Sequence, residues 1–251
     1  MLRCGLLGQT LGHSWSPRIH TLLGDYEYLL YEKSEQEIPS FLRSGSWDGL
    51  NVTIPYKKTV LPYLDVLSPV AESIGSVNTI VRRADGTLFG DNTDVDGFVA
   101  MVRLSGFSVA GTKVLVLGSG GASVSICEAL RSMNATPVVV SRHGPIDYDH
   151  ISDQSDAAWL VNTTPVGMYP NIDSSPLDLT LLPNLRGVLD IVYNPPVTRL
   201  MTQAQSLGLP ALSGLYMLVA QARRSAELFT NTSISDARVE DIYRIMLDEH
   251  P

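Results

Sequence analysis

The chain has 251 residues, of which 44% are hydrophobic, and 26 acidic residues against 18 basic ones give a formal net charge of -8 at pH 7. This length and apolar content can build one large or two modest domains. The acidic balance, without a cluster of Lys and Arg, argues against a nucleic acid or an anionic membrane surface as partner.

Targeting and redox signals are absent from the sequence. No apolar run approaches the roughly 20 residues that span a bilayer, and the start reads as a strand with no signal peptide, so we expect a cytoplasmic location. Cys4 and Cys127 lie far apart with no C-x-x-C spacing, which predicts two free thiols and no metal site.

The first predicted elements are a strand over residues 2–7 and a helix over residues 18–23. Ser16 before Pro17 is typical of an N-cap followed by the first helical residue. The hydroxyls of Ser14 and Ser16 would then gather at a helix start, in a pocket the size of a carboxylate. The alternative is that Ser16 only caps the helix and Ser14 is solvated.

Three more segments complete a β-α-β-α-β opening. Residues 26–31 and 48–53 predict strands and residues 35–43 a helix, for which parallel pairing is the natural topology.

The last of these strands belongs to the run Asn-Val-Thr-Ile-Pro-Tyr-Lys57. Its apolar, β-branched part stops at Pro55, which predicts a buried strand end followed by a turn that carries Thr53 and Lys57.

A helix and a hairpin are predicted next. Residues 69–74 form a short helical pattern, and strands over residues 77–81 and 88–89 flank Asp-Gly86, a strong hairpin signal. Asn78 lies where the first hairpin strand begins.

The run Gly-Asp-Asn-Thr-Asp94 places several polar side chains at a junction between strand and helix, with Asp94 in the first turn of a helix that reaches Leu104. The Lys57 ammonium and the Asp94 carboxylate could therefore converge on one small polar substrate. The alternative is an ordinary surface ion pair.

The pattern then restarts with a buried strand over residues 114–117, the turn Gly-Ser-Gly-Gly-Ala-Ser123 and a helix over residues 124–133. This order brings backbone amides at a helix start against a dinucleotide pyrophosphate. The string departs from the plain G-x-G-x-x-G fingerprint, and the alternative is a tight turn without ligand.

The next strand, over residues 136–140, ends at Ser141-Arg142-His143. An acidic residue at this place binds the ribose diol of NAD, whereas an Arg accepts the 2′-phosphate of NADP. Arg142 therefore indicates NADP, although a loop could bring Asp147 or Asp149 back to the ribose.

Strands over residues 157–161 and 187–192 also end in polar or small residues, and in an open α/β sheet such ends line the ligand cleft. Helices are predicted over residues 198–207, from residue 214 onward and over residues 233–251. Gln221 lies on or beside an apolar stripe, where its amide either bonds to nearby backbone or reaches the substrate.

Together these motifs resemble the shikimate dehydrogenase family over nearly the whole chain and in the family's order. The matching runs are His-Ser-Trp-Ser-Pro17, Asn-Val-Thr-Ile-Pro-Tyr-Lys57, Ser-Val-Asn-Thr79, Asp-Asn-Thr-Asp94, the glycine loop at 118–122, Asn-Thr-Thr-Pro-Val-Gly-Met168, Asp-Ile-Val-Tyr193 and Met-Leu-Val-Ala-Gln221.

The resemblance implies two α/β domains: a mainly parallel substrate-binding domain over 1–98, completed by helices from 213–251 that pack back on it, and a Rossmann-type NADP-binding domain over 99–212. It also implies NADP-dependent, reversible reduction of 3-dehydroshikimate to shikimate, in the shikimate pathway of aromatic amino-acid biosynthesis. The partner would be this small molecule, and the protein a monomer or homodimer.

The resemblance also assigns the site residues. Lys57 and Asp94 would be the catalytic pair. The implied substrate-binding residues are Ser14, Ser16, Thr53, Asn78, Asp94, Tyr193 and Gln221. The implied cofactor-binding residues are Gly118, Ser119, Gly120, Gly121, Ala122, Ser141, Arg142, His143, Ile191 and Gly214.

The chain departs from the family pattern in three places. The second Arg that often follows the position of Arg142 is missing, the Y-x-P turn continues into Thr-Arg-Leu200, and Tyr216 replaces a frequent small residue. The alternatives are an NAD-preferring quinate/shikimate dehydrogenase and a catalytically inactive dinucleotide-binding protein.

Overall fold

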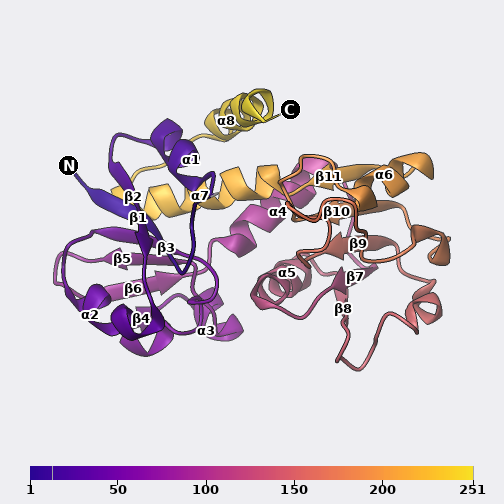
Figure 1. Cartoon of the computed structure of the whole chain (residues 1–251), viewed down its shortest axis with the longest axis horizontal. Helices are drawn as coiled ribbons and strands as arrows, with labels where there is room; N and C mark the ends of the chain where they lie inside the picture. The colour runs from indigo at the N-terminus through magenta and orange to yellow at the C-terminus, as the bar shows by residue number, and fades with distance from the viewer. Residues whose placement is uncertain (13, 251) are drawn as a thin grey trace. The chain divides into compact units, whose positions relative to one another are not determined.

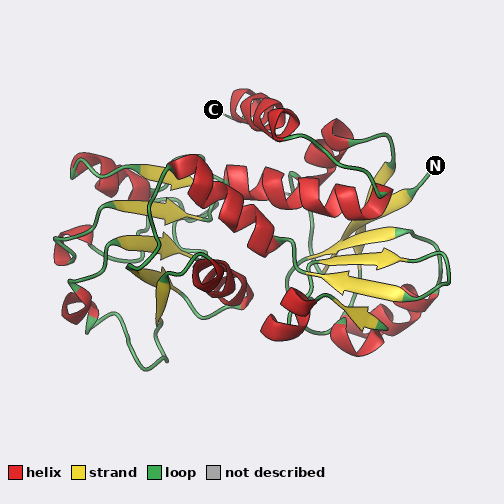
Figure 2. Cartoon of the chain, turned by 180° about the vertical axis from the view of Figure 1, so that it is seen from behind, coloured by secondary structure: helices red, strands yellow, loops and turns green. Residues whose placement is uncertain are grey.

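The structure, a computed structural model, describes residues 1–12 and 14–250. His13, in the predicted serine loop, lies outside them. Two compact units divide the chain: unit 1 contains Met1–Asp96 and Val219–Met246, and unit 2 contains Gly97–Leu218 and the segment from Leu247 on. Each unit holds one β-sheet with helices beside it (Figures 1 and 2).

The sheet of unit 1 runs in the order β2-β1-β3-β5-β6-β4. Its strands are β1 (Arg3–Gly8), β2 (Glu27–Glu32), β3 (Gly49–Val52), β4 (Val66–Leu67), β5 (Thr79–Arg82) and β6 (Leu88–Asp91). β1 pairs in parallel with β2 and β3, β4 pairs in parallel with β6, and β5 is antiparallel to both of its neighbours. The carboxyl ends of β1, β3 and β6 therefore lie at one edge, together with the start of β5.

The helices of unit 1 surround an apolar core. They are α1 (Ser16–Leu23), α2 (Ile38–Arg43), α3 (Pro69–Ile74), the start of α4 (Asp94–Ser105), most of α7 (Leu215–Thr230) and α8 (Asp236–Glu249). One core cluster includes Leu7, Leu42, Leu50, Tyr56 and Ile80.

The C-terminal helices pack on the N-terminal part of unit 1, as predicted. In α8 the Arg238 guanidinium donates to the Leu22 carbonyl in α1, at 2.6 Å. In α7 the Phe229 ring occupies the space above Gly49 of β3, where an added Cβ would meet a ring carbon at 2.3 Å. One helical turn earlier, Ser225 accepts a hydrogen bond from Asn51, two residues further along β3. These two contacts fix the position of α7 along β3.

Unit 2 has the predicted Rossmann-type arrangement, a wholly parallel sheet in the order β11-β10-β9-β7-β8. Its strands are β7 (Lys113–Leu117), β8 (Thr136–Val140), β9 (Trp159–Asn162), β10 (Gly187–Asp190) and β11 (Ala211–Ser213), and its helices include α5 (Gly121–Ser132) and α6 (Arg199–Ser206). Leu115, Leu160, Val188 and Leu200 contribute to one core of this unit.

Some boundaries differ from the predictions. The predicted helix over 35–43 begins as a 3₁₀ turn at Glu35–Glu37, which Ser34 and Glu37 close with a capping box. The helix after the glycine turn begins at Gly121 and not at residue 124. In the part of the chain that the structure describes, none of the helices combines the length and the apolar character needed to cross a membrane.

Candidate active site

Lys57 and Asp94 form an ion pair in unit 1, which we call the Lys–Asp pair. The ammonium Nζ lies 2.5 Å from Asp94 Oδ2, and the two side chains are 19% and 12% exposed. An exposed pair would be largely screened by water, whereas this one is mostly shielded. The two predicted catalytic groups therefore meet, and not on an open surface.

The backbone around Lys57 is held on both sides. Thr53 donates its N–H to the Leu7 carbonyl at 2.9 Å, which ties the turn to the end of β1. Tyr56 is buried and its hydroxyl donates to the Lys33 carbonyl at 2.5 Å. The carbonyl of Lys57 accepts from the N–H of Val77 at 2.8 Å. These hydrogen bonds fix the backbone at Lys57, and its side chain extends from there to the Asp94 carboxylate.

Asp94 is the first residue of α4, where the helix dipole favours a negative charge. Its second carboxylate oxygen, Oδ1, accepts from Asn78 Nδ2 at 2.9 Å. The side-chain carbonyl oxygen of Asn78, Oδ1, accepts a hydrogen bond from the backbone N–H of Thr93 at 2.7 Å, which fixes the orientation of the Asn78 amide. Among the described residues, Oδ2 is paired with Lys57 and Oδ1 with Asn78, and a carboxylate oxygen can accept a further hydrogen bond from a substrate hydroxyl.

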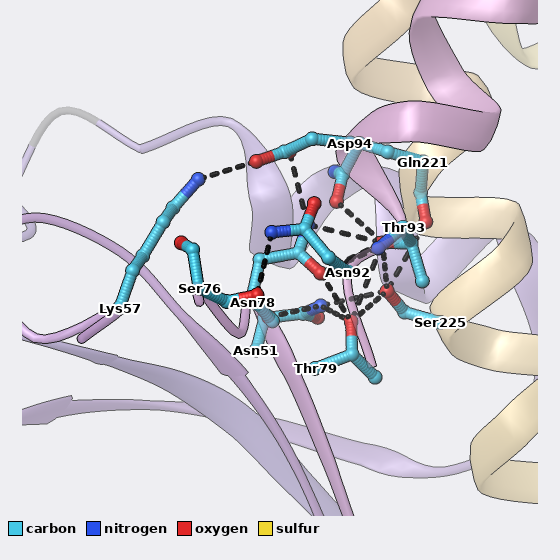
Figure 3. Close-up of polar contacts among 10 residues, drawn as sticks. All are labelled: Asn51, Lys57, Ser76, Asn78, Thr79, Asn92, Thr93, Asp94, Gln221 and Ser225. Atoms are coloured by element: carbon cyan, nitrogen blue, oxygen red, sulfur yellow. Dashed lines mark hydrogen bonds and ion pairs between the residues drawn. The ribbon is translucent and has the colours of Figure 1, made fainter. Parts of the chain in front are cut away.

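Behind this pair lies a set of polar side chains that we call the buried polar network (Figure 3). All are at most 9% exposed and come from β3, the start of β5 and the residue before it, the β6–α4 junction and α7. Its members are Asn51, Asn78, Thr79, Thr93, Gln221 and Ser225.

Gln221 faces this network. Its Oε1 lies 3.5 Å from Thr93 Oγ1. Ser76 lies beside the network, fully buried, and its hydroxyl has no partner among the described residues.

The serine loop differs from the prediction in one respect. Trp15 occupies the N-cap position without a side-chain hydrogen bond, and Ser16 is already the first residue of α1. The expectation that Ser16 caps this helix is therefore wrong. Ser14 is half-buried and its hydroxyl accepts the Ser16 N–H at 3.3 Å, while Ser16 itself is buried. Within the described residues neither hydroxyl is bonded to the Lys–Asp pair.

Thr53 leaves the carboxyl end of β3 beside Gly8, at the end of β1. A Cβ added at Gly8 would lie 2.8 Å from the Thr53 methyl group, so the close approach of these two segments requires glycine at that position.

In unit 2 the glycine turn has the geometry of a phosphate site. Gly118 adopts φ +100°, in the region that favours glycine, and its N–H donates to the Val140 carbonyl at 2.8 Å. Gly120 is the N-cap of α5 and offers no side-chain cap to the free amides of the first turn, which contains Gly121 and Ala122.

The glycines of this turn show that the residues present fit a dinucleotide. A Cβ added at Gly120 or Gly121 would meet nothing within 4 Å, so no packing inside the protein requires glycine there. A ligand that approaches the backbone closely does require it. Ser119 and Gly120 are both exposed.

Next to this turn, β8 ends at Val140 and is followed by Ser141, Arg142 and His143. Ser141 is buried, and the side chains of Arg142 and His143 are exposed. The nearby Asp147 carboxylate accepts from His150 Nδ1 at 2.6 Å and from the backbone N–H groups of residues 149 and 150. These hydrogen bonds lower the pKa of Asp147 and tie its carboxylate to its own turn, which leaves Arg142 as the group suited to a phosphate.

Ile191 and Gly214 lie against each other beyond β10 and β11. A Cβ on Gly214 would be 2.1 Å from the Ile191 carbonyl oxygen, and the Gly214 N–H donates to Val192 at 3.0 Å. Tyr193 is half-buried in the same loop, and burial raises the pKa of its hydroxyl.

Asp190 holds the loops around these residues. Its carboxylate accepts from Asn162 Nδ2 at 2.9 Å, from the Val192 N–H at 3.1 Å and from the Thr198 hydroxyl at 2.7 Å. Burial raises the pKa of Asp190 to about 6, against the opposing effect of these hydrogen bonds.

Sequence reasoning missed several residues of these sites. Thr79 and Thr93 stand inside two of the quoted motifs, and Ser225 lies one helical turn after Gln221, so spacing could have suggested all three. Asp190 could also have been suggested from the sequence, because it is an acidic residue at the end of a buried strand.

Comparisons with known proteins identify the family of this chain. Residues 6–80 match the family model described as the shikimate dehydrogenase substrate binding domain. A shikimate dehydrogenase (NADP(+)) of Clostridium perfringens (strain ATCC 13124) is 36% identical, over 95% of this chain and 96% of the relative.

Solved structures give the same result. A chorismate mutase/shikimate 5-dehydrogenase fusion protein from Clostridium acetobutylicum is similar with a TM-score of 0.94 and 32% identity, covering 100% of this chain and 98% of that one. Shikimate 5-dehydrogenase from Thermus thermophilus, in complex with NADP(H) and shikimate, has a TM-score of 0.88 and 32% identity, with 98% and 99% covered. The chain therefore belongs to the shikimate dehydrogenase family.

Proposed function

We propose that this chain catalyses the NADP-dependent, reversible reduction of 3-dehydroshikimate to shikimate. The observation that carries the proposal is the Lys–Asp pair, a shielded ammonium 2.5 Å from a carboxylate at the edge of a buried polar network. Such an arrangement can serve a reaction in which negative charge develops on a carbonyl oxygen.

The chemistry assigns a role to each member of the pair. NADP, when bound, supplies or accepts the hydride. The Lys57 ammonium stabilises the charge on the substrate oxygen and donates a proton to it, directly or through a water. Asp94 holds the ammonium by a charge-assisted hydrogen bond and accepts a hydrogen bond from a substrate hydroxyl.

Other polar groups bind the substrate in this proposal. Ser14 and Ser16 bind its carboxylate. The ring and its hydroxyls are contacted by Thr53, Asn78, Tyr193 and Gln221. The proposed substrate domain is 1–98 with 213–251, and the proposed cofactor domain is 99–212.

Residues of the second domain hold NADP. The pyrophosphate binds the backbone of the glycine turn, with Gly118, Ser119, Gly120, Gly121 and Ala122. Arg142 binds the 2′-phosphate between Ser141 and His143, while Ile191 and Gly214 contact the rest of the cofactor. We further propose a cytoplasmic location and, by the resemblance to the family, a monomer or homodimer.

The direct test measures oxidation of NADPH in the presence of 3-dehydroshikimate. Lys57→Met should lower turnover by about 10²- to 10⁴-fold, the usual share of a positioned acid or base, and leave the protein folded. The control is Lys58→Met, which removes the adjacent, exposed ammonium. Near-normal turnover in Lys57→Met would exclude Lys57 from the chemistry.

The same assay separates the alternatives. Titration of NADP and NAD with shikimate and with quinate identifies the preferred pair. Binding of the cofactor without turnover of any of these substrates would instead support an inactive dinucleotide-binding protein.

A further inference from the structure

The orientation of the Asn78 amide in the buried polar network follows from one backbone group. The N–H of Thr93 is only a donor, so the Asn78 atom 2.7 Å away is the carbonyl oxygen Oδ1. The amide nitrogen of Asn78 therefore faces Asp94. Thr79 Oγ1 lies 3.0 Å from the same Oδ1, which cannot donate, and 2.8 Å from Ser225 Oγ, which can. Both contacts are hydrogen bonds only if the Thr79 hydroxyl donates to Asn78 and accepts from Ser225.

The next groups away from the Lys–Asp pair are oriented in turn. Because the Thr79 proton is committed, its oxygen accepts from Asn51 Nδ2, 3.2 Å away. The other proton of that nitrogen goes to Ser225 Oγ at 2.7 Å. Asn51 Oδ1 then faces the Tyr28 hydroxyl, which donates to it at 2.8 Å. Every bond from Tyr28 to the Asp94 carboxylate thus donates in the same direction.

Burial strengthens this series of hydrogen bonds from Tyr28 to Asp94. Asn51, Asn78, Thr79 and Ser225 are at most 5% exposed, so water cannot replace a missing partner. Hydrogen bonds aligned in one direction polarise one another, and the low dielectric strengthens each of them. The Asn78 N–H that reaches Asp94 is therefore both oriented and strengthened by groups that lie far from the pair.

Ser225 connects this series of hydrogen bonds to α7. Having accepted from Asn51, its hydroxyl is left to donate to Thr79 Oγ1, 2.8 Å away, and it also lies 3.1 Å from the Gln221 carbonyl one turn earlier. Together with the fit of Phe229 over Gly49, these contacts set where α7 lies along β3 and hence where Gln221 faces the network.

From this geometry we propose that Thr79 and Ser225 are positioning residues for the reaction. Thr79 holds the Asn78 amide that fixes the Asp94 carboxylate, and Ser225 holds Asn51 and α7. Neither hydroxyl is bonded to Lys57 or Asp94 in the described residues. The inference rests on the proposed function, because it concerns the same catalytic pair.

The first test compares two substitutions at one position. Thr79→Val keeps the shape of the side chain and removes the hydroxyl, whereas Thr79→Ser keeps the hydroxyl. Thr79→Val should lower kcat and kcat/KM together by about 10- to 100-fold, the effect of a small misplacement of catalytic groups. Thr79→Ser should restore both to within about threefold of the wild type, because it keeps the hydrogen bond.

The second test uses a matched pair of hydroxyls on α7. Ser225→Ala and Thr230→Val each remove a hydroxyl that lies within hydrogen-bond distance of the carbonyl four residues earlier, Gln221 and Ala226 respectively. Only Ser225 belongs to the network, so Ser225→Ala should lower kcat by about tenfold and Thr230→Val should leave it unchanged. The dissociation constant of NADP⁺ should be the same in all variants, since the cofactor residues lie in the other unit.

The outcomes separate this inference from the proposed function. A wild type without turnover of 3-dehydroshikimate overturns the proposed function, and the inference with it. A wild type that is active while folded Thr79→Val keeps its kcat to within about twofold overturns the inference alone. Equal losses in Thr79→Ser and Thr79→Val would also overturn it, since the side chain's shape and not its hydroxyl would then matter. If Thr79→Val does not fold, the comparison of Ser225→Ala with Thr230→Val decides.

Discussion

Acidification should destabilise unit 1 through a single buried histidine. His20 of α1 is fully buried, stacks on Tyr28 with ring centroids 3.9 Å apart, and lies with Nδ1 2.6 Å from the Tyr26 hydroxyl. Burial lowers the pKa of His20 from 6.5 to about 3. The folded protein therefore keeps this imidazole neutral at pH values where the unfolded chain protonates it.

The sign and size of the effect follow from these two pKa values. Between pH 6.5 and pH 3 the unfolded state binds one proton more than the folded state, so stability is lost as the pH falls through this window. Each pH unit below 6.5 costs the folded state about 1.4 kcal/mol, which gives a loss of about 2 kcal/mol between pH 7 and pH 5.

The assay compares His20→Phe with the wild type. The phenyl ring keeps the stack on Tyr28, and the lost hydrogen bond to Tyr26 costs the same at both pH values, so it cancels. Hydrogen exchange of the β1 and β3 amides in urea at pH 7 and pH 5 reports the stability of unit 1. The variant should lose about 2 kcal/mol less than the wild type. His150→Gln, which removes an exposed histidine of unit 2, should leave this difference unchanged. Equal losses in His20→Phe and the wild type would show that His20 is not held neutral.

Three further predictions concern single buried or open positions. Asp190→Asn should change the pH dependence of stability in the opposite direction to His20→Phe. Because the folded-state pKa of Asp190 is about 6, the folded state binds the proton before the unfolded state does as the pH falls. Unit 2 of the wild type should therefore gain about 1 kcal/mol of stability relative to the variant between pH 7 and pH 5, measured by hydrogen exchange of the β9 and β10 amides. Ser76→Ala removes a buried hydroxyl without a partner among the described residues, so the free energy of unfolding in urea should stay equal or rise by up to about 1 kcal/mol, and a clear loss would contradict this. Gly120→Ala adds a Cβ in open space at φ -80°, so stability should stay within about 0.5 kcal/mol while the NADP⁺ dissociation constant, measured by calorimetry, rises by about tenfold or more; unchanged affinity would place the pyrophosphate elsewhere.

Elements with strong local signals were predicted correctly from the sequence. The helix over 69–74 has the bounds observed for α3, because Ser68 accepts the Ala71 N–H as N-cap, Pro69 suits the first turn, and Gly75 ends the helix at φ +60°. The same holds for β7, β8, β9 and β10 of unit 2, each of which was predicted as a strand bounded by glycine or polar residues.

Other elements depend on distant partners and could not be predicted. β4 has two residues and β11 has three, too few for a periodic pattern, and each exists because a neighbouring strand pairs with it. The start of α1 was misplaced because Ser16 followed by Pro17 fits an N-cap equally well in sequence, whereas the loop makes Trp15 the capping position.

The candidate site likewise contains residues that could be predicted from the sequence and residues that could not. Lys57 and Asp94 attract notice because charged groups at strand ends suggest chemistry, and the structure brings them into contact. Thr79 and Ser225 carry small uncharged hydroxyls, as many ordinary core residues do, so residue type alone does not set them apart. Asn51 and Ser225 are 174 positions apart, so only the folded chain shows that they are bonded.

The contacts of α7 imply that the catalytic groups near the start of the chain depend on its last quarter. Gln221 and Ser225 supply one wall of the buried polar network, and both lie in Val219–Met246, the later segment of unit 1. Without that segment Asn51 and Thr93 would face water, which competes for every hydrogen bond they now make with α7. The Lys–Asp pair could still form, but the oriented donors behind Asp94 would be lost. The substrate unit is therefore complete only when the C-terminal helices have docked on the sheet, although all residues of the Lys–Asp pair precede residue 95.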